Sequence, residues 1–138
     1  MSKLLLNMDE YSLLEYKLGD AVPEKFGGDY YQNFDKGYGI YLEHGQISTI
    51  VIYFREGYKK FDAFNGGIIF KGNENNFDKN TTFEEVTSVL GKPNNQWNDQ
   101  VEMCAEYFKK NENQDFNIEI IWHVDGKVTL DYISIELN

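Results

Sequence analysis

Two stretches of this 138-residue chain are rich in β-branched and aromatic residues, and each is divided by a glycine turn. Residues 39–54 contain the dipeptide His44-Gly45, and residues 118–137 contain Asp125-Gly126. A dipeptide of this kind between two β-rich runs is a strong short-range signal for a β-hairpin. The sequence therefore predicts two hairpins. Further strands are expected at residues 29–34, 66–71 and 104–109.

Two short segments have the residue spacing of a helix capping box. Ser12 and Glu15 have this spacing, as do Thr82 and Glu85, and a Leu-Gly pair follows each box. In a capping box the hydroxyl and the carboxylate satisfy free amides of the first helical turn, and glycine favours the end of a helix. The sequence therefore predicts two helices of about two turns each, which are too short to be stable without packing on a larger element.

The predicted helices and hairpins follow one another in the same order twice along the chain. When Gly45 is aligned with Gly126, Ile52 falls on Ile133. We therefore predict a single domain with an internal duplication, in which repeat 1 covers about residues 11–70 and repeat 2 about residues 81–138. The expected fold class is α+β, an antiparallel sheet built from two tandem helix-plus-hairpin repeats with the short helices packed on one face.

Charge and aromatic content limit the kinds of protein and partner that fit this chain. It has 23 Asp and Glu against 13 Lys and Arg, a formal charge of −10, together with ten Phe, ten Tyr and two Trp. So many aromatic residues argue against an intrinsically disordered chain, because they supply the apolar surface that a core needs. The negative charge disfavours direct nucleic-acid binding, which depends on Lys and Arg, and favours a basic protein partner.

The sequence also allows a prediction of the cellular compartment. Cys104 is the only cysteine, so the chain has no internal disulfide and needs no oxidising compartment. The apolar run Leu4-Leu5-Leu6 is shorter than the core of an export signal, and no apolar stretch is long enough to span a membrane. We therefore expect a cytoplasmic protein that does not interact with membranes, and the oligomeric state stays open.

No arrangement of residues indicates catalysis. The sequence lacks a nucleophile elbow, a phosphate-binding loop, a zinc-binding helix motif and a cysteine pair. His44 is predicted in a hairpin turn and His123 in a strand, where a surface or interface role is the simpler interpretation. The polar segment 73–80 lacks the ligand order of a calcium-binding loop. We therefore expect a protein that is not an enzyme and that binds no metal and no cofactor.

Strand alternation divides the side chains of each hairpin between two faces, and neither face is cleanly polar. In the second hairpin the expected core face carries Phe116, Ile118, Ile120, Trp122, Val124, Ile133 and Ile135. The opposite face mixes apolar residues with carboxylates, namely Glu119, Ile121, His123, Val128, Leu130, Tyr132, Ser134 and Glu136. In the first hairpin one face is expected to carry Tyr38, Ile40, Leu42, Ile47, Val51 and Tyr53, and the other Tyr41, Ile50, Ile52 and Phe54.

Two interpretations of these mixed faces stay open. In the first, helices and loops cover the second face, or a β-bulge shifts the register by one residue and mixes the two sets. In the second, this face is a surface on which a protein docks, because Tyr and Trp supply rigid contact area and carboxylates complement a basic partner.

Several segments resemble a known group of bacterial proteins. They are Tyr30-Tyr31, Gly39-Ile40, residues 45–50, residues 64–67 and the Thr-x-Glu-Glu-Val-x-x-x-Leu-Gly-x-Pro pattern at residues 82–93. From about residue 12 to its end, the chain resembles small proteins built from tandem repeats similar to the beta-lactamase inhibitor protein. Several such acidic proteins look like immunity proteins, which neutralise toxins of contact-dependent or polymorphic toxin systems. The chain departs from the inhibitor itself because it lacks the disulfides, and the resemblance assigns no binding residue by position.

The physical properties and the resemblance lead to one functional hypothesis. We expect an acidic immunity protein that binds and neutralises a cognate, basic toxin domain, for example a nuclease, by protein–protein contact. Carboxylates would pair with Lys and Arg of the toxin, and aromatic side chains would supply contact area. The candidate partner-binding residues are Tyr38, Tyr41, Glu43, Tyr53, Glu119, Trp122, His123, Asp131, Tyr132 and Glu136.

Two alternatives come from other functional classes. An acidic chain of this kind also suits a DNA mimic that inhibits a nucleic-acid enzyme, in which carboxylates would lie in rows spaced like phosphates. A small-ligand-binding protein or enzyme would instead need an enclosed pocket in which His44 or His123 converges on acidic residues.

Overall fold

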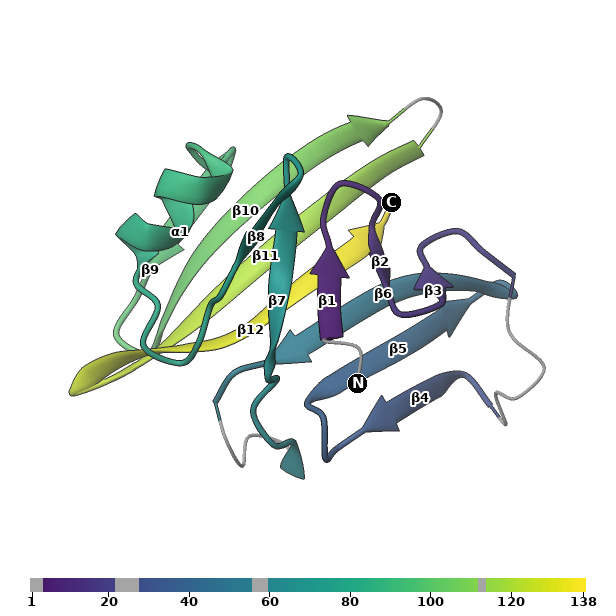
Figure 1. Ribbon diagram of the computed structural model, residues 1–138. Helices are drawn as coiled ribbons and strands as arrows, with labels where there is room; N and C mark the ends of the chain where they lie inside the picture. Colours follow the sequence, from purple (N-terminus) through teal and green to yellow (C-terminus); the bar gives the residue numbers. More distant parts are fainter. Residues whose placement is uncertain (1–3, 22–27, 56–59, 112–113) are drawn as a thin grey trace.

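The protein is built almost entirely from β-strands. The computed structural model describes residues 4–21, 28–55, 60–111 and 114–138. Strands account for 57% of the residues and helix for 7%, and the strands form two sheets of five and seven strands (Figure 1). Among the described residues, no helix has both the length and the apolar character needed to cross a membrane.

The larger sheet, sheet B, contains both predicted hairpins, which are confirmed. The hairpin of β5 (Tyr38–Glu43) and β6 (Gln46–Tyr53) turns at His44 and Gly45, with φ angles of 54° and 76°. The hairpin of β11 (Gln114–Asp125) and β12 (Lys127–Leu137) turns at Gly126, with a φ of 73°. The strands predicted at 29–34 and 104–109 are also confirmed, as β4 and the middle of β10. In spatial order the sheet consists of β4 (Tyr30–Asn33), β5 (Tyr38–Glu43), β6 (Gln46–Tyr53), β12 (Lys127–Leu137), β11 (Gln114–Asp125), β10 (Glu102–Asn111) and β9 (Asn95–Asn98).

The strand order of sheet B has an internal symmetry. From its middle outward the order is β6-β5-β4 on one side and β12-β11-β10 on the other. The two halves meet where β6 and β12 pair antiparallel, and Ile52 lies opposite Ile133 in this pairing. Ile52 and Ile133 are equivalent positions when Gly45 is aligned with Gly126. The strand order of sheet B is therefore the order expected for two copies of a three-stranded unit related by a two-fold axis.

The smaller sheet, sheet A, covers part of one face of sheet B. Its strands are β3 (Tyr16–Lys17), β2 (Ser12–Leu13), β1 (Leu4–Asn7), β7 (Gly66–Phe70) and β8 (Asn73–Asn75), in that spatial order. The strand predicted at 66–71 is thus confirmed as β7, and it pairs parallel with β1. A Cβ at Gly66 would collide with the carbonyl oxygen of Leu4, so glycine permits the close approach of these two strands.

The predicted first helix is wrong. The predicted α+β fold class with short helices packed on one face is also wrong, because the described residues are mostly β and contain one α-helix. Residues 12–17 form the two short strands β2 and β3, joined by a turn in which Leu14 has a φ of 56°. Four buried side chains explain this outcome, because Tyr11 and Leu13 precede the turn, Tyr16 and Leu18 follow it, and each pair has the two-residue period of a strand. The hydroxyl-to-carboxylate spacing of a capping box was present, but packing against β1 determined the local structure.

The predicted second helix is confirmed as α1 (Phe83–Leu90). The hydroxyl of Thr82 accepts a hydrogen bond from the amide of Glu85 at 3.1 Å, and the Glu85 carboxylate accepts one from the Thr82 amide at 3.1 Å. Val86 and Leu90 are buried, and the ring of Phe83 lies 5.6 Å from that of Trp122. This helix therefore needs both its cap and its contact with sheet B, as its short length requires.

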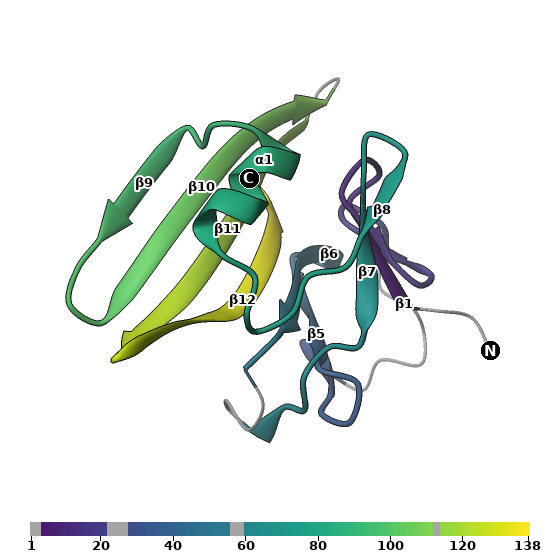
Figure 2. The ribbon, with the colours of Figure 1, turned by 60° about the vertical axis from the view of Figure 1, so that its left-hand side comes forward.

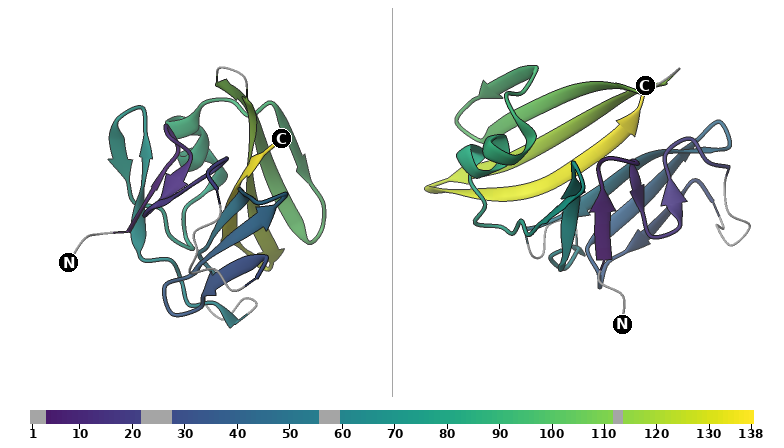
Figure 3. Two further views of the ribbon diagram at one scale, coloured as in Figure 1. Left: turned by 90° about the vertical axis from the view of Figure 1, so that its right-hand side faces the viewer. Right: turned by 45° about the horizontal axis from the view of Figure 1, so that its top comes forward.

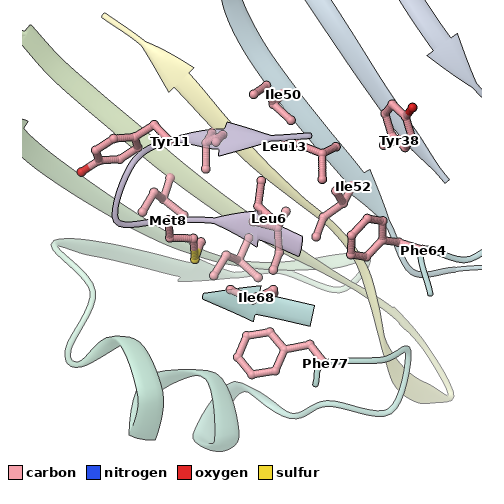
Figure 4. Close-up of a cluster of buried hydrophobic side chains, with 14 of the residues drawn as sticks. Leu6, Met8, Tyr11, Leu13, Tyr38, Ile50, Ile52, Phe64, Ile68 and Phe77 are labelled. Atoms are coloured by element: carbon pink, nitrogen blue, oxygen red, sulfur yellow. The ribbon is translucent and has the colours of Figure 1, made fainter. Parts of the chain in front are cut away.

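Sheet A and α1 lie on the same side of sheet B (Figures 2 and 3). Between these layers is one continuous core, in which Leu6, Leu13 and Ile68 of sheet A meet Ile50 and Ile52 of β6 (Figure 4). The ring of Tyr11 stacks on Phe116 at 3.8 Å and extends the contact to β11. We call the covered side of sheet B its inner face and the opposite side its outer face.

An acidic and aromatic outer face as the candidate functional site

Two β-bulges decide which residues belong to each face of sheet B. The register shifts after Tyr41 in β5 and after Ile121 in β11, which leaves Ser48 and Asp131 as the extra residues of the opposing strands. A bulge moves every residue beyond it to the other face. The bulge interpretation of the mixed hairpin faces is therefore confirmed.

The bulges correct the expected face assignments in both hairpins. Leu130, expected on the mixed face, is fully buried against the core. In the first hairpin, Ile50 and Ile52 lie on the inner face with Tyr38 and Ile40. Val51 and Tyr53, which strict alternation places with Tyr38 and Ile40, lie on the outer face instead.

The corrected outer face of β5, β6, β12 and β11 contains a hollow of about 370 Å³. It spans the junction between the two halves of the sheet. Three tyrosine rings and two carboxylates line it together with a buried serine, namely Tyr41, Tyr53, Tyr132, Glu119, Glu136 and Ser134. We call this depression the central hollow.

Hydrogen bonds and ring contacts fix the walls of the central hollow. The hydroxyls of Tyr41 and Tyr53 lie 3.3 Å apart, and Gln32 Nε2 donates to the Tyr41 hydroxyl at 3.2 Å. Phe61 stacks on Tyr53, with ring centroids 4.0 Å apart. Tyrosines held in this way lose little side-chain entropy when a partner covers them.

Glu119 is the most constrained carboxylate of this face. It is half-buried, and the Tyr132 hydroxyl donates a hydrogen bond to its Oε1 at 3.1 Å. Burial raises the pKa of Glu119, the Tyr132 hydrogen bond opposes this, and the negative charges of Glu136, Glu106 and Glu102 raise the pKa further. The charged form of Glu119 is therefore less favourable than that of a fully solvated carboxylate.

The like charges follow directly from strand pairing. Glu106 of β10 lies opposite Glu119 of β11 in the register, and two like charges in this relation destabilise a sheet. Asn95 donates to Glu106 Oε1 at 3.0 Å, but an amide carries no compensating charge. Within the part of the chain that the structure describes, no cation forms an ion pair with Glu102, Glu106, Glu119 or Glu136.

Asp131, at the second bulge, has a different environment. Its Oδ1 atom lies 2.9 Å from Arg55 Nε, an ion-pair contact without good hydrogen-bond geometry. Burial raises the pKa of Asp131, while the positive charge of Arg55 and the electrostatic interaction with His123 oppose the shift and the charge of Glu102 adds to it. The ion pair fixes the segment after β6 to the bulge, where the Asp131 carbonyl accepts the Phe54 amide at 2.7 Å.

The same carboxylates also affect Cys104 on β10. It lies opposite Ile121 in the register and is fully buried. Burial, and then the charges of Glu119, Glu106 and Glu102, raise its pKa to about 12. The thiol is therefore protonated and unreactive at neutral pH.

The structure brings together most, but not all, of the residues expected to bind a partner. Seven lie on the outer face, but two of them, Tyr53 and Asp131, are buried there at 5% and 4% exposure; the seven are Tyr41, Tyr53, Glu119, His123, Asp131, Tyr132 and Glu136. Glu43 is exposed beside the turn of the first hairpin. Tyr38 and Trp122 belong to the core, at 3% and 0% exposure, and the Trp122 indole donates to the Thr81 carbonyl at 2.9 Å, so a partner does not reach them in this fold.

Sequence reasoning missed two carboxylates of this face, Glu102 and Glu106. They alternate with Met103, Ala105 and Tyr107 along β10, so their shared face was visible in the sequence. Their position beside Glu119 could not be predicted from the sequence, because it depends on the register between β10 and β11.

No described group of three or more His, Cys, Asp and Glu side chains is arranged to hold a metal ion. His44 is exposed at its turn beside Glu43 at 4.0 Å, and His123 lies in β11 facing Glu102 across the strand pair. Comparison of the chain with family models, with curated proteins and with solved structures gave no match.

Proposed function

We propose that this chain is an immunity protein whose outer face of sheet B binds and neutralises a basic toxin domain. A toxin that acts on nucleic acid needs a basic surface for its own substrate, and that surface complements this face. The toxin would act inside the cell, so the proposal includes a cytoplasmic location.

One observation carries the proposal, the uncompensated charge around Glu119. Glu102, Glu106 and Glu136 raise its pKa, and no described cation pairs with any of the four. A folded protein gains nothing from such an arrangement by itself, whereas a cationic partner turns the repulsion into attraction. The tyrosines beside these carboxylates supply the apolar contact area that a stable interface requires.

The test is co-expression with the toxin domain encoded next to the gene of this protein. We expect growth to be rescued and the two proteins to purify as a complex. Full toxicity in the presence of folded protein at equal or higher abundance would overturn the proposal.

A pair of matched double variants distinguishes binding at the outer face from a general effect of net charge. Glu119→Gln with Glu136→Gln removes two charges from the central hollow, and Glu10→Gln with Glu84→Gln removes two from sheet A and α1 on the other side. Loss of rescue only in the first variant supports binding at the outer face. Equal loss in both would mean that only net charge matters.

A further inference from the structure

We propose that the central hollow receives a single arginine side chain of the basic partner and is the anchor point of the interface. This inference rests on the proposed function and specifies the chemical group that the site recognises. It concerns Tyr41, Tyr53, Tyr132, Glu119 and Glu136.

The size and walls of the hollow suit a flat cation. Its volume of about 370 Å³ lies near the lower end of the roughly 300–1,000 Å³ found for ligand sites, too small for more than a side chain or a small molecule. Tyr53 is 5% exposed and one face of its ring is stacked on Phe61, so the rings that a partner can reach are the half-buried ones of Tyr41 and Tyr132. A guanidinium group can lie against such a ring and gain cation–π energy, which grows as the site loses water.

The carboxylates favour arginine over lysine. Glu119 and Glu136 lie on the neighbouring strands β11 and β12, diagonally related because Glu119 pairs with Ser134 and Glu136 with Asn117. Guanidinium presents five donors in a planar fork that can reach two acceptors at once, whereas an ammonium is a point charge. Because Tyr132 already donates to one oxygen of Glu119, that carboxylate is oriented before the partner arrives.

The position of the hollow also suits an anchor. It lies across the β6–β12 junction, in the middle of a seven-stranded sheet. Residues that dominate binding energy cluster near the centre of an interface, where surrounding contacts exclude water, and arginine is enriched among them. Further carboxylates stand on one side of it, at Glu106 and Glu102 of β10, and would strengthen the attraction for a positive charge.

The first experiment uses small probes in place of the partner. Isotope-labelled protein is titrated with acetyl-Gly-Arg-Gly-amide and followed by amide chemical shifts. The same titration is made with the lysine peptide and with the citrulline peptide, which keeps the shape of arginine without its charge. We expect saturable shifts around residues 41, 53, 119, 132 and 136 for arginine, weaker binding for lysine and none for citrulline.

Variants locate the binding. Glu119→Gln with Glu136→Gln should weaken arginine-peptide binding by about tenfold or more, and Tyr132→Phe by a smaller factor. Glu10→Gln with Glu84→Gln should leave it within about twofold, as expected for distant, screened charges. The inference is overturned by equal binding of citrulline, by shifts spread over the whole acidic surface, or by equal weakening in the control variant.

A second experiment uses the complex and distinguishes this inference from the proposed function. Exposed arginines of the toxin domain are replaced one at a time by lysine, and affinity is measured with wild-type protein and with Glu119→Gln. We expect one arginine whose replacement weakens binding by about tenfold or more with wild-type protein and much less with the variant, the mark of a direct contact. If rescue and complex formation occur but no arginine couples to Glu119, the anchor is wrong and the immunity function stands. If no complex forms, the proposed function fails, whatever the peptide does.

Discussion

The two faces of sheet B are made from alternate residues of the same strands, and they differ in what they contribute. On the inner face, Ile118, Ile120, Ile133 and Ile135 are no more than 1% exposed and join one core with sheet A and α1. On the outer face, their neighbour Glu119 stands among like charges in a tyrosine-lined hollow. The inner face thus explains why the chain folds, and the outer face contains groups that stability alone does not explain.

The largest expected contrast comes from the two tryptophans of the chain. Trp122 is fully buried on the inner face, whereas Trp97 on edge strand β9 is 40% exposed. Trp122→Ala should reduce the free energy of unfolding by about 3–5 kcal/mol, because it leaves a large cavity and an unpaired Thr81 carbonyl. Trp97→Ala should cost less than about 1 kcal/mol, as is usual for a side chain with little burial.

Chemical denaturation measures both values. If Trp122→Ala does not fold, Trp122→Phe retains most of the volume and should still cost about 1–3 kcal/mol through the lost indole hydrogen bond. Equal effects of the two tryptophan substitutions would contradict the assignment of the faces.

The next contrast concerns pH. Because the pKa values of Glu119 and Asp131 are raised in the folded state, folded protein holds these protons more tightly than unfolded protein. Their contribution to stability is therefore complete below the unfolded pKa of about 4 and is lost as pH rises through the folded values. Stability should rise as pH falls through the folded pKa values of these two groups toward about 4, although Asp99, whose pKa is lowered by backbone amides, acts in the opposite sense at lower pH.

Thermal unfolding at low ionic strength between about pH 4 and pH 7 checks this prediction. Salt should weaken only the part of the trend that comes from repulsion among these half-buried carboxylates, because it screens charges but leaves the effect of burial unchanged. A stability that falls steadily from pH 7 to about pH 4 would contradict the raised pKa values of Glu119 and Asp131.

A smaller effect is expected from neutralising one outer-face charge. Glu119→Gln removes the repulsion from Glu106 and Glu136 while retaining an acceptor for Tyr132, so the isolated protein should be more stable by up to about 1 kcal/mol at pH 7. Glu84→Gln at the start of α1 should instead cost a few tenths of a kcal/mol, roughly the value of a carboxylate near a helix N-terminus. Denaturant titration of both variants compares the signs, and destabilisation by Glu119→Gln would contradict the electrostatic account.

The smallest effect concerns the reactivity of Cys104. With its pKa raised to about 12, the thiol should resist iodoacetamide at pH 8 in folded protein and react quickly in denaturant. Mass spectrometry measures the fraction of the protein in which Cys104 has reacted with iodoacetamide. Rapid modification of the folded protein would contradict the burial of Cys104 in β10.

Local patterns in the sequence predicted the hairpins and α1, because turn dipeptides and capping residues act over a few neighbours. They did not predict sheet A. Its strand β1 pairs with β7, about 60 residues further along the chain, and such pairing leaves little local trace. The capping-box spacing at Ser12 failed for the same reason, since contacts with β1 outweighed a weak local preference.

The candidate site was predictable in composition but not in geometry. Tyr41, Tyr132 and Glu119 could be selected as aromatic and acidic strand residues, and they line one hollow. Tyr38 and Trp122 have the same chemistry and lie in the core. The difference depends on strand register, and the bulges at Ser48 and Asp131 change it by one residue without any clear signal in the sequence.

The most direct test of the proposed binding site is the affinity of the proposed toxin partner for the two matched double variants, measured by calorimetric titration at one salt concentration. Glu119→Gln with Glu136→Gln should weaken binding by about 100-fold, the effect of truncating desolvated charges at an interface centre, while the variant itself is at least as stable as wild type. Glu10→Gln with Glu84→Gln, which removes the same charge from the other side, should change affinity by less than about threefold. Undiminished affinity of the outer-face variant, or an equal loss in both, would contradict the claim that the outer face of sheet B is the binding site.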